Sequence, residues 1–480
     1  MATQRINFSE WLPDQPGLSG ALTEAKNVVS QAIGYGPLPL PVAIAQGSGE
    51  ALKTLYATKD KLGVTQLFAG GTTKVFTVSN LGAFTNVSGA TYATPNNNRM
   101  RFTQFGDVVI FANDVDKLQG FNVTSSATFD DLSASAPVAR YVTVVRDFVV
   151  SANIVDVSNR VTNRVRWSGI NDETEWDFSQ TTQADYQDIP DGGNIVGITG
   201  GEFGLIFLEK SIHRMSYVGT PFIFQFDNIS RGTGCISENS IAQYQGITFF
   251  LSSDGFYMCD GQSVKPIGAE KIDRWFFDNV DLTQMDTMSA AIDPVRKLVI
   301  WNFLSSGSIR KLLIHNFKTG KWTNAEALTD YIADASTGSV TLEQLDGLSA
   351  SLDDLGQSLD SASFIGGQSF LGGLKEDDIY AFTGLPRAGE IITGDVDVGG
   401  RSVVTLARPQ VDNGSATVAV SSRTRLDETV GFNTPVAASS ENRIPLRSAG
   451  RYHRFKVNPT GANWNNAVGI DVDVVGQGGR

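Results

Sequence analysis

One hairpin pattern recurs along the first 385 residues, and it limits the folds open to this chain of 480 residues. A typical copy is ITFFLSSDGFYMCDG (247–261), where an apolar strand meets a Ser-Asp-Gly turn and an aromatic strand returns. Similar hairpins are predicted with turns near residues 70, 114, 152, 209, 254, 306 or 319, and 368. Successive turns lie about 40 to 57 residues apart, which is the period of four-stranded propeller blades.

These repeats predict an all-β fold, a β-propeller of about six or seven blades. A single blade cannot bury both of its faces, so neighbouring copies must pack around an axis. The composition agrees, because 49 Gly and 28 Phe with only 19% charged residues favour short strands and tight turns over helices. A pair of β-sandwiches with irregular hairpins is the alternative.

The predicted propeller covers residues 51–385 and is flanked by two other segments. Residues 1–50 are predicted to form an N-terminal extended strap, because the prolines of GPLPLP (36–41) enforce an extended backbone. An ordinary ordered connection is the alternative. Residues 386–480 alternate with period two, as in TVAVSSRTR (417–425), and are predicted to form an antiparallel C-terminal β domain.

An acidic insertion at 328–362 interrupts the predicted propeller. Its leucines follow the 3, 4, 3, 4 spacing of an amphipathic helix, although two glycines, Ser and Asp weaken an isolated helix. Two turns capped by Asp, SLDDL and QSLDS, are the alternative. In either case we expect the leucines to contact the body of the protein or a neighbouring subunit, and the candidate interface residues are Leu345, Leu352 and Leu359.

Charge is distributed unevenly along the chain, whose formal net charge is −13. Residues 325–400 contain 14 acidic and two basic residues, whereas residues 401–480 contain 10 basic and six acidic ones. This pattern excludes tight binding of nucleic acid but suits a surface past which a polyanion slides. The densest basic cluster, RSAGRYHRF (447–455), makes Arg447, Arg451 and Arg454 candidate contacts for an acidic neighbouring subunit; a solvated edge strand is the alternative.

The sequence predicts no catalytic residue, cofactor or metal site, so no enzyme is expected. Cys235 and Cys259 are expected to be reduced and buried, and the three histidines lie too far apart for metal-ligand spacing. The turn in SSDGFYM is similar to an Asp-box, but Asp254 and Gly255 are adjacent, and such a box is structural. Neither a signal peptide nor an apolar segment of about 20 residues is visible, so we expect cytoplasmic synthesis without a membrane anchor.

Several stretches resemble the hub or nozzle propeller proteins of bacteriophage tails, also called packaged-DNA stabilisation proteins. The resemblance spans most of the chain and is strongest in its centre. It rests on WLPDQPG (11–17) with NVVSQAIGYGPLPLPV (27–42), RVRWSGINDETEWDFS (164–179), ISRGTGCISENSIAQYQGITFFLSSDGFYMCDG (229–261), SLDDLGQSLDS (351–361) and GRYHRFKVNPTGANWNNAVGIDVDV (450–474).

This resemblance implies a structural protein of the virion tail, assembled in the host bacterial cytoplasm. It implies a homo-oligomeric ring, a hexamer, below the portal and its adaptor, which lines or closes the DNA exit channel. Its partners would be the portal-adaptor, other tail proteins such as fibres, a spike or a needle, and translocating DNA in transient non-specific contact. The alternatives are a receptor-binding or glycan-processing phage propeller and a bacterial scaffold propeller unrelated to phages.

Overall fold

The computed structural model describes residues 2–80, 82–338 and 367–477. Within these ranges the chain is almost entirely β-structure, with one α-helix, α1 (Asp273–Asn279), and two 3₁₀ helices, η1 (Glu238–Ser240) and η2 (Leu282–Thr287). No helix in the described ranges is long and apolar enough to cross a membrane. Leu345, Leu352 and Leu359 lie outside the described residues, so their predicted contacts stay a prediction.

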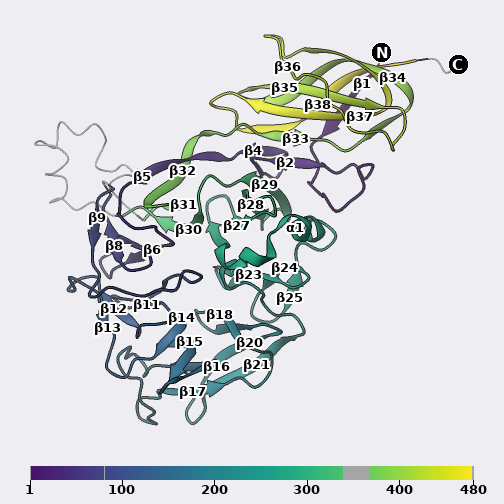
Figure 1. Ribbon diagram of the computed structural model, residues 1–480. Helices are drawn as coiled ribbons and strands as arrows, with labels where there is room; N and C mark the ends of the chain where they lie inside the picture. The colour runs from purple at the N-terminus through teal and green to yellow at the C-terminus, as the bar shows by residue number, and fades with distance from the viewer. Residues whose placement is uncertain (1, 81, 339–366, 478–480) are drawn as a thin grey trace, which may run out of the picture.

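Seven four-stranded units of the described chain form a closed ring, which confirms the predicted β-propeller (Figure 1). Blades 1 to 3 consist of β6 (Thr54–Lys59), β7 (Thr65–Gly70), β8 (Val75–Val78), β9 (Phe84–Asn86), β10 (Arg101–Phe105), β11 (Val108–Ala112), β12 (Gln119–Asn122), β13 (Asp130–Asp131), β14 (Val138–Val145), β15 (Phe148–Asp156), β16 (Asn159–Trp167) and β17 (Asp185–Asp188). Blades 4 to 6 consist of β18 (Ile195–Thr199), β19 (Gly204–Leu208), β20 (Ser211–Gly219), β21 (Ile223–Arg231), β22 (Ala242–Tyr244), β23 (Ile247–Ser252), β24 (Gly255–Cys259), β25 (Val264–Pro266), β26 (Ser289–Asp293), β27 (Leu298–Leu304), β28 (Arg310–Asn316) and β29 (Lys321–Glu326).

The seventh blade closes the ring with a strand from the N-terminal segment. Its strands are β30 (Tyr331–Ser336), β31 (Ser369–Lys375), β32 (Asp378–Pro386) and the outer strand β5 (Pro39–Ala45), which pairs antiparallel with β32. Pro39 and Pro41 of GPLPLP are tolerated because β5 is an edge strand with only one hydrogen-bonded neighbour. The predicted strap therefore lies along the body of its own chain.

The recurring hairpins are the second and third strands of the blades. The turns predicted near 70, 114, 209, 254 and 306 join β7–β8, β11–β12, β19–β20, β23–β24 and β27–β28. The turn predicted near 152 was wrong, because Asn153 lies at a register shift inside β15 and the chain reverses after Asp156. The turn predicted near 368 was also wrong, since β31 begins at Ser369 and the chain reverses after Lys375.

The C-terminal domain shares one sheet with blade 6. Its strands are β33 (Glu390–Ile392), β34 (Val396–Asp412), β35 (Ser415–Arg423), β36 (Val436–Ala437), β37 (Ile444–Thr460) and β38 (Asn466–Gly476). From the N-terminal segment, β1 (Ala2–Asn7) pairs with β38, β3 (Val28–Ser30) pairs with β4 (Tyr35–Pro37), and β2 (Glu24–Lys26) lies between β29 and β33. A 14-stranded sheet thus runs from blade 6 into this domain.

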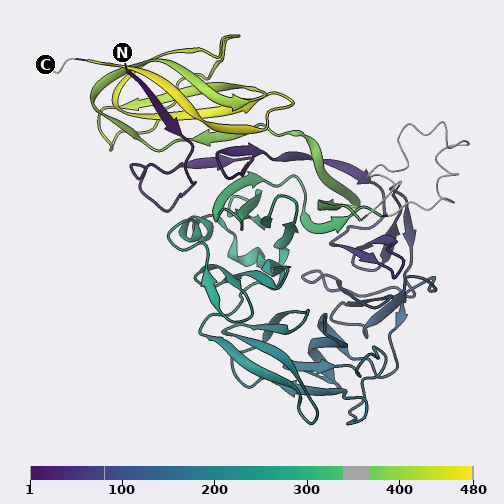
Figure 2. The same cartoon turned by 180° about the vertical axis from the view of Figure 1, so that it is seen from behind.

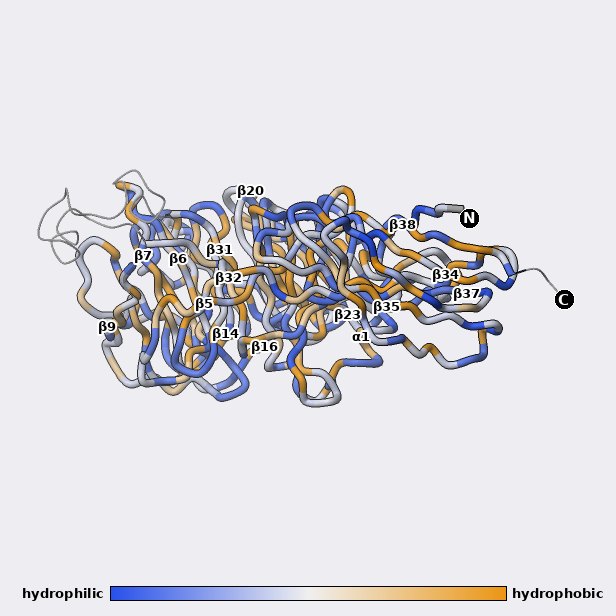
Figure 3. Tube along the Cα trace, turned by 90° about the horizontal axis from the view of Figure 1, so that it is seen from above, coloured by the Kyte–Doolittle hydropathy of each residue, from blue (hydrophilic) through white to orange (hydrophobic). Residues whose placement is uncertain are grey.

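A single apolar cluster supports this junction. Phe256 of blade 5 packs with its ring tilted against Trp301 and Trp322 of blade 6, with ring centroids 4.5 Å and 5.6 Å away. The same cluster continues through the buried Tyr35 of the N-terminal segment to Trp464 of the C-terminal domain. Figure 2 shows the domain beside the ring, and Figure 3 shows both parts within one flat layer. The propeller and the C-terminal domain therefore form one packed body and are not independent domains joined by a linker.

Candidate functional site at the propeller axis

Charged residues gather at one end of the propeller axis, where the chain enters each blade. The innermost strands all run in the same direction, because each blade is an up-and-down sheet that begins at the axis. Arg101 is the first residue of β10, and Arg140 and Tyr141 lie near the start of β14. The connection from blade 4 to blade 5 carries η1, which brings Glu238 to the same end.

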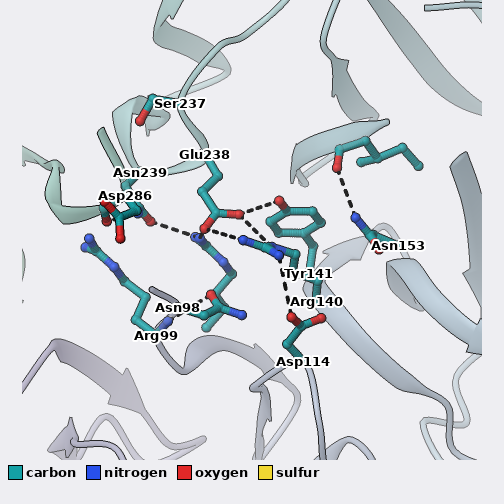
Figure 4. Close-up of polar contacts among 12 residues, drawn as sticks. Asn98, Arg99, Asp114, Arg140, Tyr141, Asn153, Ser237, Glu238, Asn239 and Asp286 are labelled. Carbon is teal, nitrogen blue, oxygen red and sulfur yellow. Dashed lines mark hydrogen bonds and ion pairs between the residues drawn. The ribbon is translucent and has the colours of Figure 1, made fainter. Parts of the chain in front are cut away.

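Glu238 joins three parts of the propeller, an arrangement that we call the axial brace (Figure 4). Arg140 donates from Nε and Nη2 to the two carboxylate oxygens, at 2.8 and 3.0 Å. Arg101 lies 3.2 Å from one of these oxygens, and the Tyr141 hydroxyl donates to the other at 2.5 Å. Blade 2, blade 3 and the connection to blade 5 are therefore tied together by one carboxylate.

The neighbouring connection completes the brace. Asn239 of η1 accepts a hydrogen bond from Arg101 at 2.9 Å and donates to the Asp286 carbonyl of η2 at 2.8 Å. Trp301 of blade 6 donates to the Ser240 carbonyl at 2.8 Å, which fixes the end of η1. Side chains from blades 2 and 6 thus hold η1, and Asn239 of η1 in turn holds η2.

The charges in the axial brace keep Glu238 ionised. Burial alone would raise the pKa of Glu238, but Arg101 and then Arg140 and Tyr141 outweigh it and lower the pKa to about 2. Burial first, and the Glu238 charge second, raise the pKa of Tyr141 well above its usual value. A phenol that stays protonated and a carboxylate that is already hydrogen-bonded are a poor nucleophile and a poor general base. The arrangement is suited to holding the connections in place.

A polar cavity of about 370 Å³ lies beside the brace. Its charged lining residues are Arg140, Arg160, Glu209, Glu238 and Asp286. Arg140 and Arg160 both contact Asp114, at 3.5 and 2.7 Å, so most of the charge around this cavity is internally compensated.

The three arginines of the predicted basic cluster in the C-terminal domain have different surroundings. Arg447 is exposed on β37, and Arg451 pairs with Asp397 at 3.0 Å on the surface. Arg454 instead binds the buried carboxylate of Asp395 at 2.7 Å, and its role at an interface stays a prediction. Arg447 and Arg451 remain interface candidates.

Two other predicted features have structural positions. Cys235 and Cys259 are both free and buried, as expected. In the Asp-Gly turn, Asp254 accepts a hydrogen bond from the Tyr257 hydroxyl at 2.6 Å. Among the described residues, no three His, Cys, Asp or Glu side chains are grouped as metal ligands.

Sequence reasoning missed the axial brace. The signal that could have found it is the pair of arginines in NNNRMRF (96–102), directly before an innermost strand, where apolar residues are usual. A second signal is the Arg-Tyr pair in VARYVTV (138–144), at the corresponding place in the next blade. Only the ring places these two positions opposite Glu238.

Comparison with known proteins adds little beyond the fold. No protein-family model matches the chain, and no curated protein matches it. Among solved structures, a virginiamycin B lyase from Staphylococcus aureus is similar over 71% of this chain and 97% of its own, with 10% identity and a TM-score of 0.40. BamB from Moraxella catarrhalis is similar over 79% of this chain and 97% of its own, with 9% identity and a TM-score of 0.35. The Pan2 WD40 domain of Neurospora crassa is similar over 74% and 96%, with 7% identity and a TM-score of 0.39.

Proposed function

We propose that this protein is a structural component of a bacteriophage tail, a hub or nozzle subunit that forms a ring around the path of the DNA. The observation that carries the proposal is the continuous sheet from blade 6 into the C-terminal domain. It makes the propeller and the domain one rigid body with broad side faces, which suits a subunit that closes a ring by heterologous contacts. The sequence resemblance to tail propellers supports the same function.

The axial brace agrees with a scaffold role. A binding or catalytic propeller usually keeps a concave pocket with free polar groups at its axis. Here Glu238 uses its oxygens on Arg101, Arg140 and Tyr141 and holds two connections across the axis. In the proposed ring, DNA passes through the central opening that the subunits surround, and not through the axis of one propeller. A net charge of −13 disfavours lasting contact of such a channel wall with phosphate.

The proposed ring is a hexamer of this chain that joins the portal-adaptor above to other tail proteins below, and it has no enzymatic activity. Purified virions of the source phage test this directly, by mass spectrometry of the particle proteins and by cryo-electron microscopy of the tail. The expected result is this chain in the particle, as density repeated around the tail axis. Particles that infect normally and lack the chain would refute the proposal.

A second candidate, a receptor-binding or glycan-processing propeller, is favoured by one observation. Three arginines and a Tyr-carboxylate pair at an axis are groups that an acidic sugar could engage, although here Glu238 already occupies two of the arginines. A glycan array and a hydrolysis assay on host polysaccharides separate the candidates. Turnover that is lost in Glu238→Gln would favour the enzyme, whereas the tail subunit predicts none.

A further inference from the structure

The brace lies at one end of the propeller axis, and a separate cavity of about 350 Å³ lies toward the other end. Its walls come from the innermost strands of blades 1, 5, 6 and 7, which are β6, β22, β26 and β30. Tyr244 and Asp334 line it at or near the ends of their strands, whereas the arginines of the brace lie at or near the starts of theirs. A cavity of this volume is large enough for a small molecule.

Asp334 borders this cavity without a cationic partner. It is the one charged residue among the described residues that line the cavity, and it forms no ion pair with any described Lys, Arg or His. Asp334 is exposed, yet burial raises the pKa of its carboxyl, and hydrogen bonds from the backbone N–H groups of Asp334 and Ile292 do not offset this. Its exposed surface therefore faces the cavity and not the outside of the protein. An enclosed carboxylate is costly to keep ionised unless a cation neutralises it.

Two tyrosines line the same cavity. Tyr56 stacks on Phe102 with ring centres 5.7 Å apart, and its hydroxyl forms no hydrogen bond with a described group. Burial, and then the charge of Asp334, raise the pKa of Tyr56, which places the phenol and the carboxylate close to each other. Lys297 donates to the Tyr244 hydroxyl at 2.8 Å and lies over that ring, 4.9 Å from its centre. Tyr244 thus already binds an ammonium group, whereas Tyr56 and Asp334 bind none.

We propose that this cavity binds an organic ammonium group, held by the carboxylate of Asp334 and by Tyr56. The carboxylate accepts a charge-assisted hydrogen bond from the ammonium, and a tyrosine ring attracts a cation through its face. The lining residues Ile292, Pro294 and Ala335 are apolar and suit the alkyl chain of an aliphatic amine. The site needs no ring of subunits and shares no residue with the brace, so it goes beyond the proposed function.

Isothermal titration calorimetry of the full chain with butylammonium chloride at neutral pH tests the site, with sodium chloride at equal ionic strength as the blank. Butanol has a similar alkyl chain without the charge and should not bind. Nα-acetyl-lysine amide carries the same butylammonium chain on a peptide backbone. Tighter binding of this compound than of butylammonium assigns the site to a lysine side chain of another protein, and equal or weaker binding assigns it to a free amine.

Asp334→Asn keeps the shape of the side chain and removes its charge. It should weaken the binding of butylammonium roughly ten- to a hundred-fold, the usual cost of losing a charge-assisted hydrogen bond. Asp427→Asn is the matched control, since the Asp427 side chain is 63% exposed on the C-terminal domain, and it should bind as the wild type does. Asp334→Asn should also fold, because it removes a charge that has no partner.

Thermal unfolding gives a second readout. Butylammonium should raise the midpoint of the wild type and of Asp427→Asn but not that of Asp334→Asn, since a ligand stabilises only the fold that binds it. Ser336→Leu places a larger apolar side chain at a residue that lines the cavity, so it should also lose the shift, and it decides the question if Asp334→Asn does not fold. The proposal is overturned if the wild type binds butylammonium no better than butanol, or if the folded cavity variant binds as tightly as Asp427→Asn.

Discussion

Replacement of Glu238 by alanine removes the one carboxylate of the axial brace and leaves its cations in place. The Glu238 side chain is only 10% exposed, and those of Arg101 and Arg140 are 20% and 27% exposed. Breaking a fully buried ion pair from one side costs about 3–5 kcal/mol. Because both arginines are partly hydrated and Arg140 keeps Asp114 at 3.5 Å, we expect a loss near the low end, about 3 kcal/mol.

Equilibrium unfolding in urea at neutral pH measures this loss. Trp301 provides a local reporter, because its indole donates to the Ser240 carbonyl of η1. Asp397→Ala is the matched control, since it also removes the carboxylate partner of an arginine, Arg451. The side chains of Asp397 and Arg451 are more exposed, at 33% and 48%. The control should lose less than about 1 kcal/mol. If Glu238→Ala costs no more than Asp397→Ala, the brace does not hold the axis together, and the reasoning is wrong.

Three further predictions concern acid-base behaviour and one turn. Burial, followed by repulsion from Lys271, lowers the pKa of His315 to about 3. Between about pH 6.5 and about pH 3 the unfolded chain therefore binds one more proton than the folded chain, so this histidine should lower the stability by about 1.4 kcal/mol per pH unit as the pH falls. Urea titrations should find the slope of stability against pH smaller by that amount in His315→Phe. Burial, with Asp14 and Asp254 nearby, raises the pKa of Asp273 to about 6, so the stabilising contribution of its protonated form is present at low pH and is lost as the pH rises through about 6. After allowance for solvent screening, Asp273→Asn should raise the free energy of unfolding by about 1–2 kcal/mol at pH 8 and should leave it unchanged below about pH 4. Gly255→Ala would put a Cβ 2.1 Å from an Asp273 oxygen at a φ of 149°, and should lower the stability by about 3 kcal/mol or more. The control Gly246→Ala has a positive φ but open space around it, and should lower the stability by about 1 kcal/mol. Equal losses of stability in thermal unfolding would contradict the clash.

The hairpins were predictable because their determinants are local. Apolar strands, turn residues and a constant spacing are all visible within about 50 residues, and the blade is built from them. The errors were local too. Asn153 has the chemistry of a turn residue but lies at a register shift inside β15, and the turn expected near 368 falls at the start of β31. Turn-forming residues suggested a reversal at both places, whereas strand pairing puts the reversals after Asp156 and Lys375.

Long-range pairing could not be read from the sequence. The residue pair Lys26 and Asn324 joins β2 to β29, and nothing near either residue indicates the other. The Glu238 brace has the same character, since its arginines come from two other blades. Alternation predicted that Arg454 belongs to a strand, but the buried Asp395 that neutralises it lies across the sheet. Charge partners depend on register between distant strands, and one sequence does not determine that register.

The N-terminal segment explains how the two lobes can act as one subunit. Its first strand pairs with β38 at the far side of the C-terminal domain, β2 lies between β29 and β33, and β5 completes blade 7. A force on the domain therefore reaches blades 6 and 7 through backbone hydrogen bonds of one continuous segment. Separation of the lobes would have to break these pairings together with the shared apolar cluster. For a subunit proposed to keep its shape in a ring while DNA passes, this continuity matters more than any single side chain.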